Sequence, residues 1–180
     1  MKKLFMLLFS LLFFTTAINA QETAQKPLEF TIKTIDNKTL HATELKNGIA
    51  FKEFKGKVVL LEFWGTHCPP CLYSIEHYKK LMNEYKDKVA MLAIEVQMTP
   101  KEQLKKFVQA KGINYYIGTQ EENMNFVRYI AQRAGWQGAI PFLITLDTKG
   151  NVIDIKVGYA SEQYVKSLID YALKKENKKK

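Results

Sequence analysis

A continuous apolar run followed at once by two cysteines constrains this chain more than any other feature. Residues 58–64 read VVLLEFW, and a run of this length indicates a strand buried on both faces of a sheet. Cys68 and Cys71 come next, at the start of a predicted helix that extends to about Lys86. The chain of 180 residues has no other cysteine, so neither has another partner within the chain. Thiols at positions i and i+3 of a helix start can close a disulfide with little backbone movement, which predicts a reversible dithiol.

The rest of the hydrophobic pattern predicts an α/β domain. Alternation at 29–36, a turn, and a return at 39–41 predict a small N-terminal β-hairpin. Further strands are predicted at 89–96, 142–146 and 152–157, and further helices at 99–111, 121–134 and after Ser161. The order is β-hairpin, β, α, β, α, α, β, β, α. The early βαβ unit indicates parallel pairing, and the late β-hairpin adds an antiparallel edge.

Polar residues at the helix ends give more detailed expectations. Thr99 is predicted to cap the second helix, with Pro100 at its first position and Glu102 completing a capping box. Ser161 is predicted to cap the last helix. His77 falls on the polar face of the helix that follows the cysteines, so we expect its side chain to be solvated.

The N-terminus has the pattern of an export signal. Met1–Lys3 is basic, residues 4–14 are apolar, and residues 15–20 are small and polar, which predicts a signal peptide over residues 1–20. The apolar run is shorter than the roughly 20 residues of a membrane-spanning helix. No integral membrane segment is therefore expected after cleavage, although an uncleaved N-terminal anchor is the alternative. Export to an oxidising compartment, the periplasm, would leave a cysteine pair oxidised unless another thiol reduces it.

The mature chain has the length of one domain. We assign residues 21–27 to a linker, 28–175 to the folded domain and 176–180 to a basic tail. Loss of Lys2 and Lys3 lowers the formal net charge from +9 to +7. A basic tail can bind nucleic acid or anionic lipid, but a solvated C-terminus is the simpler interpretation, and no nucleic-acid partner is expected of an exported chain.

The element order, with CxxC at the first strand–helix junction, resembles the thioredoxin fold. Residues 56–71, GKVVLLEFWGTHCPPC, and the Ala139–Pro141 segment before 142–147 are similar to exported thioredoxin-like proteins of the TlpA/ResA type. That group includes thiol reductases of cytochrome c maturation, and the resemblance covers about residues 28–173. It implies a mixed central sheet flanked by helices, with an N-terminal β-hairpin and an extra helix before Pro141. Two departures border the site: His67 replaces a tryptophan and Ser74 replaces a glutamate.

The cysteines have distinct expected roles. Cys68 is the predicted attacking thiol, because a helix N-terminus favours the thiolate that attacks disulfides. Cys71 lies one turn deeper and is the predicted resolving thiol. Pro69 needs no hydrogen-bond acceptor in the first turn of the helix, and Pro70 completes the CPPC motif. A zinc site needs four ligands and CxxC supplies two, so we predict no metal and no cofactor beyond the cysteine pair.

Glu62 and His67 are candidate tuning residues. The resemblance implies that Glu62 moves protons for Cys71, which would suit a buried carboxyl with a raised pKa. The alternative is an edge position with the carboxylate in water. A protonated His67 would stabilise the Cys68 thiolate and make the disulfide more oxidising. The alternative is a surface side chain that merely replaces a tryptophan.

The segment before the third predicted strand completes the site. The resemblance implies a cis peptide bond before Pro141, with this proline against the disulfide. It also implies that the backbone of Ile140 pairs with an incoming substrate strand. Trp64 and Trp136 are expected near this surface, although core packing would explain both tryptophans equally well.

These observations predict a periplasmic thiol:disulfide oxidoreductase that acts through a mixed disulfide on Cys68. The resemblance implies reduction of cysteine-containing proteins, for example apocytochrome c, with electrons from a membrane thiol carrier. An oxidase or isomerase of folding proteins is the first alternative, which His67 favours. The second alternative, from another class, is a copper- or haem-delivery protein that binds through Cys68, Cys71 and a histidine.

Overall fold

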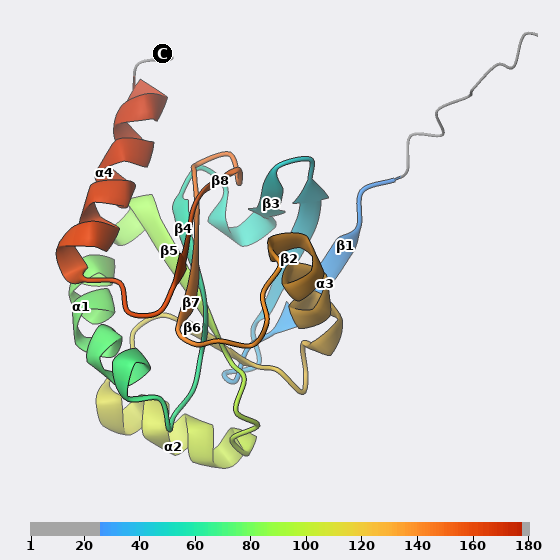
Figure 1. Ribbon diagram of the computed structural model, residues 1–180, viewed down its shortest axis with the longest axis vertical. Coiled ribbons are helices and arrows are strands. Elements are labelled where there is room, and N and C mark those ends of the chain that lie inside the picture. The colour runs from blue at the N-terminus through green and yellow to red at the C-terminus, as the bar shows by residue number, and fades with distance from the viewer. Residues whose placement is uncertain (1–25, 178–180) are drawn as a thin grey trace, which may run out of the picture.

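The computed structural model describes residues 26–177, which form two sheets and four α-helices (Figure 1). The predicted signal peptide, most of the linker and the last three residues of the tail lie outside the described residues. The central sheet has the order β6-β5-β4-β7-β8 and a smaller sheet the order β1-β2-β3. The strands are β1 Glu29–Lys33, β2 Thr39–Leu45, β3 Gly48–Phe51, β4 Val58–Trp64, β5 Val89–Glu95, β6 Tyr116–Thr119, β7 Phe142–Leu146 and β8 Val152–Val157. The helices are α1 Pro69–Tyr85, α2 Lys101–Lys111, α3 Met124–Ala134 and α4 Glu162–Asn177.

The central sheet is mixed, as predicted. Strands β4, β5 and β6 are parallel, whereas β7 pairs antiparallel with β4 and β8 antiparallel with β7. Helices α1 and α4 pack on one face, and α3 and the smaller sheet lie on the other (Figure 1). The side chains of β4 alternate between these faces, so Leu60 and Trp64 join the cluster under α1, and Leu61 and Phe63 join the opposite one. Both faces of β4 are buried, which explains its continuous apolar sequence.

Two short strands were missed by the sequence prediction. The N-terminal β-hairpin has a third strand, β3, which pairs with β2 beyond the Lys46–Asn47 turn. Strand β6 is a four-residue edge strand with Gly118 in its middle, so its β propensity is weak. A Cβ on Gly118 would lie 2.8 Å from Ile94 Cδ1 and 2.9 Å from the Asn123 amide nitrogen, so this glycine permits a close approach. Both strands therefore exist because they pair with a neighbouring strand, and hydrophobic periodicity along the chain does not predict such pairing.

Two predicted helix starts were wrong. Helix α3 begins at Met124 instead of Glu121, because the buried Asn123 side chain bonds the backbone of Lys33 and Thr119 and holds residues 120–123 in a turn. Helix α2 has Pro100 at its N-cap, without a side-chain cap, so the predicted capping box is not formed. The Thr99 hydroxyl donates to Glu95 instead, at 2.8 Å. A buried carboxylate outcompetes the exposed helix end for this hydroxyl.

The last helix starts as predicted and ends later than the assigned domain. The Ser161 hydroxyl accepts from the backbone N–H of Tyr164 at 3.2 Å, which caps α4. The helix continues to Asn177, so it includes two residues that we had assigned to the basic tail. None of the helices described here combines the length and the apolar character that crossing a membrane requires.

His77 is buried, so the prediction of a solvated side chain was wrong. Its exposed fraction is 5%. The ring packs edge-on against Tyr78 and Tyr159, at centroid distances of 4.5 and 5.9 Å. Tyr159 precedes α4, which lies across α1, and this packing covers a helix face that looks polar in isolation. Among the described residues, His77 Nε2 has no hydrogen-bond partner, and burial lowers the pKa of the ring.

We expect His77→Leu to stabilise the protein by about 1 kcal/mol, because a buried polar atom without a partner costs roughly 1–3 kcal/mol. A depressed histidine pKa means that the unfolded state binds more protons as the pH falls below 6.5. The advantage of leucine should therefore grow from pH 7 to pH 5. Urea unfolding of both proteins at these pH values measures it, and a destabilised variant at pH 5 would contradict the prediction.

Candidate active site

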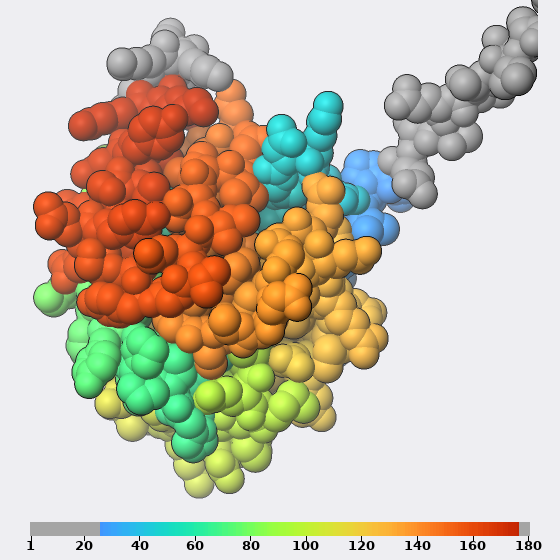
Figure 2. All heavy atoms as spheres, in the orientation of Figure 1, coloured from blue at the N-terminus to red at the C-terminus, as the bar shows by residue number. Residues whose placement is uncertain are grey.

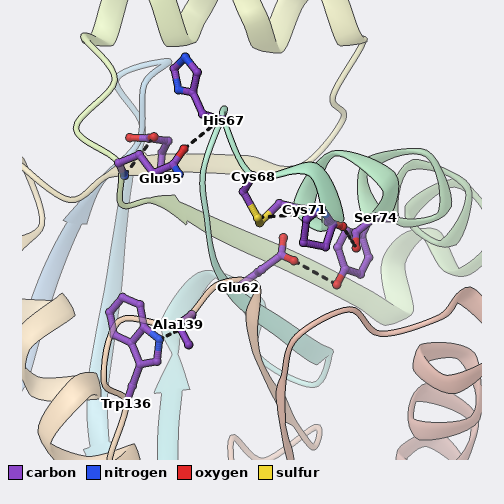
Figure 3. Close-up of a disulfide and its surroundings, with 11 residues drawn as sticks. Glu62, His67, Cys68, Cys71, Ser74, Glu95, Trp136 and Ala139 are labelled. Carbon is purple, nitrogen blue, oxygen red and sulfur yellow. Dashed lines mark hydrogen bonds between the residues drawn. A yellow bond between two sulfur atoms is a disulfide. The ribbon is translucent and has the colours of Figure 1, made fainter.

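Cys68 and Cys71 form a disulfide at the N-terminus of α1 (Figure 3). The S–S distance is 2.02 Å, and the backbone N–H of Cys71 donates to Cys68 Sγ at 3.3 Å. Cys68 is the N-cap residue, and Pro69 and Pro70 follow in the first turn, where an N–H has no intrahelical acceptor. Cys68 is 6% exposed and Cys71 1% exposed. The predicted attacking cysteine is therefore the more accessible of the two, and it lies where the helix favours negative charge.

The segment that carries the cysteines lies at the molecular surface. In the space-filling view, the start of α1 (green) borders α2 (yellow-green) and the last quarter of the chain (orange to red) (Figure 2). A protein substrate can therefore approach this end of the sheet.

Glu62 lies beneath the disulfide on the α1 side of β4. Its position between Leu60 and Trp64 in the strand alternation gives it this face, and its carboxyl points toward the cysteines (Figure 3). The side chain is 2% exposed, and Tyr78 Oη donates a hydrogen bond to Glu62 Oε1 at 3.2 Å. Burial raises the pKa of Glu62 to about 8, although the Tyr78 hydrogen bond acts in the opposite direction. The alternative of a solvated edge carboxylate does not hold.

Tyr78 is a site residue that the sequence analysis did not assign. Tyr78 recurs at helical spacing with Leu72, Ile75 and Met82, which predicts an inward position on α1, and its 1% exposure agrees. Its hydroxyl reaches Glu62 only because α1 packs across β4. The sequence offered one signal for this role. Tyr78 carries a hydroxyl on an otherwise apolar helix face, sixteen residues after Glu62. Ser74, the other departure noted above, is buried, and its hydroxyl donates to the Pro70 carbonyl at 3.2 Å.

His67 is exposed and points away from the disulfide (Figure 3). Its Nδ1 lies 3.1 Å from the Thr66 hydroxyl, and its backbone N–H donates to Gln97 Oε1 at 2.8 Å. The ring therefore contacts the Thr66 hydroxyl and does not pack over the cysteines as an apolar tryptophan could. A direct effect of its charge on Cys68 remains a prediction.

The segment before β7 lies at the same end of the sheet as the cysteines. Phe142 pairs with Phe63, which places Pro141 opposite the end of β4, and the Ile140–Pro141 peptide bond is cis. Trp136 Nε1 donates to the Ala139 carbonyl at 2.7 Å, so Trp136 holds this segment.

The two tryptophans pack in opposite clusters. Trp64 is 2% exposed, and its ring centroid is 5.9 Å from that of Phe107 on α2. Trp136 stacks on Phe142 on the other side of the sheet. Core packing accounts for Trp64, whereas Trp136 also borders the site. No group of three or more metal-binding side chains gathers among residues 26–177.

Comparisons with known proteins agree with this site. The family model described as Redoxin matches residues 22–173. The chain belongs to the redoxin family. The thiol-disulfide oxidoreductase ResA of Halalkalibacterium halodurans is 29% identical over 123 residues, which span 68% of this chain and 66% of that relative, slightly less than two thirds of its length. The thioredoxin-like protein YneN of Bacillus subtilis is 27% identical over 155 residues, or 85% of this chain and 81% of YneN.

Solved structures show the same fold. A thiol:disulfide interchange protein of the thioredoxin family from Chlorobium tepidum superposes with a TM-score of 0.68 at 22% identity, over 82% of this chain and 96% of that one. StoA from Bacillus subtilis gives a TM-score of 0.59 at 19% identity, over 79% of this chain and 96% of StoA. The predicted thioredoxin-like fold and the resemblance to ResA are thus confirmed. The family match and the relatives' names support a redox enzyme of the thiol–disulfide oxidoreductase class.

Proposed function

We propose that this protein is an exported thiol:disulfide oxidoreductase that reduces disulfides in cysteine-containing proteins of the periplasm. One observation carries the proposal: a disulfide at the start of α1 lies directly above a buried carboxyl with a raised pKa. The chemistry needs a nucleophilic thiolate, a second thiol within reach of the first, and a group that moves a proton between them. Cys68, Cys71 and Glu62 would supply these.

The reaction starts from the dithiol form. The Cys68 thiolate attacks one sulfur of the substrate disulfide, the substrate S–S bond breaks, and the released substrate thiolate takes a proton from water. Glu62 accepts the proton of Cys71, whose sulfur then attacks Cys68 Sγ. The mixed disulfide breaks, the Cys68–Cys71 disulfide forms, and the second substrate thiolate leaves and is protonated. Two electrons pass from protein to substrate, and a membrane thiol carrier returns them.

Glu62 suits the proton transfer in this scheme. A carboxyl with a pKa near 8 is ionised in roughly one molecule in ten at pH 7, and it is close to the working pH that general acid–base catalysis favours. Glu62 is buried among core side chains and accepts a hydrogen bond from Tyr78 Oη, so a proton placed there is not lost directly to bulk water.

The direction and the substrate extend the resemblance to ResA. We place the substrates among cysteine pairs of apocytochromes c, and we propose that no cofactor beyond the Cys68–Cys71 pair is used. His67, in place of a tryptophan, favours a second candidate in which the protein oxidises or isomerises disulfides of folding proteins. The two candidates differ in the reduction potential of the same disulfide.

We expect a reduction potential near or below about −250 mV, close to that of thioredoxin. Equilibration of the mature protein with glutathione or dithiothreitol buffers, followed by thiol alkylation and mass spectrometry, measures it. A potential near about −120 mV, as in strong oxidants such as DsbA, would overturn the reductive assignment in favour of the oxidase. Absence of exchange with either buffer would overturn the enzyme class.

A further inference from the structure

Glu95, the last residue of β5, is a buried acid that the exchange reaction does not use. Its exposed fraction is 0%. The two carboxylate oxygens accept three hydrogen bonds from the segment that follows: from the backbone N–H groups of Gln97 and Thr99, at 3.1 and 3.0 Å, and from the Thr99 hydroxyl at 2.8 Å. Because a carboxylate only accepts, the residues after β5 must turn their donors inward. Met98 adopts φ 61°, a conformation unusual for a residue other than glycine, in the middle of this turn.

The turn around Glu95 places two side chains against the loop that carries the cysteines. Gln97 Oε1 accepts the backbone N–H of His67 at 2.8 Å. The Gln97 side chain lies so close to Gly65 that a Cβ there would come within 2.2 Å of it. Thr99 Oγ1 lies 2.8 Å from Thr66 Oγ1. Glu95 therefore organises contacts to the three residues that precede Cys68, without touching any of them itself.

The hydroxyl groups form a chain with a defined direction. Each hydroxyl has a single hydrogen to donate. Thr99 uses its hydrogen on Glu95, so in the contact with Thr66 it is the Thr66 hydroxyl that donates. The Thr66 oxygen can then only accept from His67 Nδ1, 3.1 Å away. Nδ1 must therefore carry a hydrogen, and in the neutral ring Nε2 holds the lone pair.

We propose that Glu95, Thr99 and Thr66 form a hydrogen-bond relay that holds His67 as its Nδ1–H tautomer, so that Nε2 is the acceptor His67 presents to a substrate polypeptide at Cys68. This inference rests on the proposed function. His67 precedes the attacking cysteine, its side chain is exposed, and within residues 26–177 its Nε2 makes no hydrogen bond. The ring points away from the disulfide, so it would meet the substrate chain beside the reacting cysteine, where backbone N–H groups are the available donors. Glu95, Thr99 and Thr66 are positioning residues, since they act through His67.

The tautomer can be observed directly. ¹⁵N-histidine labelling and a long-range ¹H–¹⁵N correlation spectrum, in a buffer alkaline enough for a neutral imidazole, distinguish a protonated from an unprotonated Nδ1. We expect His67 of the wild type to be protonated at Nδ1. Thr99→Val keeps the shape of threonine but frees the Thr66 hydrogen to donate to Nδ1, so the signal should shift toward the Nε2–H form. Thr99→Ser keeps the hydroxyl and should preserve the wild-type pattern.

A kinetic cycle tests the consequence for the substrate. With a model peptide that contains one disulfide, we expect Thr99→Val to lower kcat/KM about threefold to tenfold, the worth of roughly one hydrogen bond, and Thr99→Ser to have little effect. His67→Ala should lower it to a similar extent. In the Thr99→Val, His67→Ala double variant the two losses should not add, because both remove the same interaction.

The outcomes separate this inference from the proposed function. If the wild type exchanges disulfides but its His67 is the Nε2–H tautomer, the relay is wrong and the function stands. Additive losses in the double variant would also overturn the relay, because Thr99 would then act independently of His67. If Thr99→Val folds poorly, Thr66→Ala tests the same relay. An unchanged Nδ1–H signal of His67 in the Thr66→Ala variant would contradict the relay. A wild type inert toward every disulfide would instead overturn the proposed function.

Discussion

Cys71→Ser should accumulate a stable mixed disulfide between Cys68 and a substrate, while Cys68→Ser should form none and lose roughly 10³-fold or more in activity. Only thiolates attack disulfides at an appreciable rate, and a serine hydroxyl is not ionised near neutral pH. Cys68 is the more accessible sulfur and occupies the N-cap of α1, whereas Cys71 is 1% exposed beneath it. A substrate can therefore be captured through Cys68 alone, and it is released only when Cys71 attacks the same sulfur.

The experiment uses the reduced variants and a peptide disulfide, with non-reducing electrophoresis and mass spectrometry to identify the adduct. The double variant Cys68→Ser, Cys71→Ser is the matched control for non-specific association. A peptide adduct on Cys71 of the Cys68→Ser variant, formed as fast as the adduct on Cys68, would contradict the assignment of attacking and resolving thiols.

The second large effect concerns Glu62 and pH. The pKa of this carboxyl rises from 4.5 to about 8 on folding, because burial disfavours its charged form. Between these values the native state binds more protons than the unfolded state, so this contribution to stability is complete below pH 4.5 and is lost as the pH rises to 8. The loss is up to about 1.4 kcal/mol per pH unit, or on the order of 5 kcal/mol in total. Glu62→Gln does not titrate and should remove this slope.

Guanidinium unfolding of the oxidised proteins from pH 4.5 to 9 measures the effect, and oxidised protein is used because its cysteines do not titrate. The difference in unfolding free energy between Glu62→Gln and the wild type gives the contribution of Glu62 alone, because all other groups titrate in both proteins. Tyr78→Phe is the matched variant, and we expect it to have the opposite effect. It removes the hydrogen bond that lowers the pKa of Glu62, so the loss of stability should continue to a higher pH than in the wild type. A difference independent of pH would contradict a protonated Glu62 in the native protein.

Glu62→Gln also tests whether Glu62 accepts the proton of Cys71. With Glu62→Gln we expect the mixed disulfide on Cys68 to form at the wild-type rate and to resolve about 10²-fold more slowly, a typical contribution of general acid–base catalysis. Rapid acid quench followed by alkylation separates the two steps. Equal slowing of both steps would indicate a structural effect on the site instead.

The elements that carry the cysteines could be predicted because their signals are local. The apolar run at β4, the cysteine spacing and the helical periodicity of α1 are each visible within fewer than twenty consecutive residues. The errors concern residues whose partners lie outside the helix that the pattern describes. His77 looks polar-faced on an isolated helix, and only the segment before α4 covers it. Thr99 looks like a helix cap, but its hydroxyl donates a hydrogen bond to Glu95 at the end of β5 instead.

The sequence by itself determined the redox-active cysteine pair, because two cysteines three residues apart at a helix start have no other partner within the chain. It also determined the order of the longer elements, because strand and helix periodicities are local properties, but it did not reveal the short strands β3 and β6. Only the tertiary structure decided that Glu62 is a buried acid with a raised pKa under the disulfide, and that the hydroxyls of Thr99 and Thr66 lie between Glu95 and His67. A carboxyl has the same sequence neighbours whether it lies in water or in a core. Its desolvation and its hydrogen-bond partners come from elements that only folding brings together.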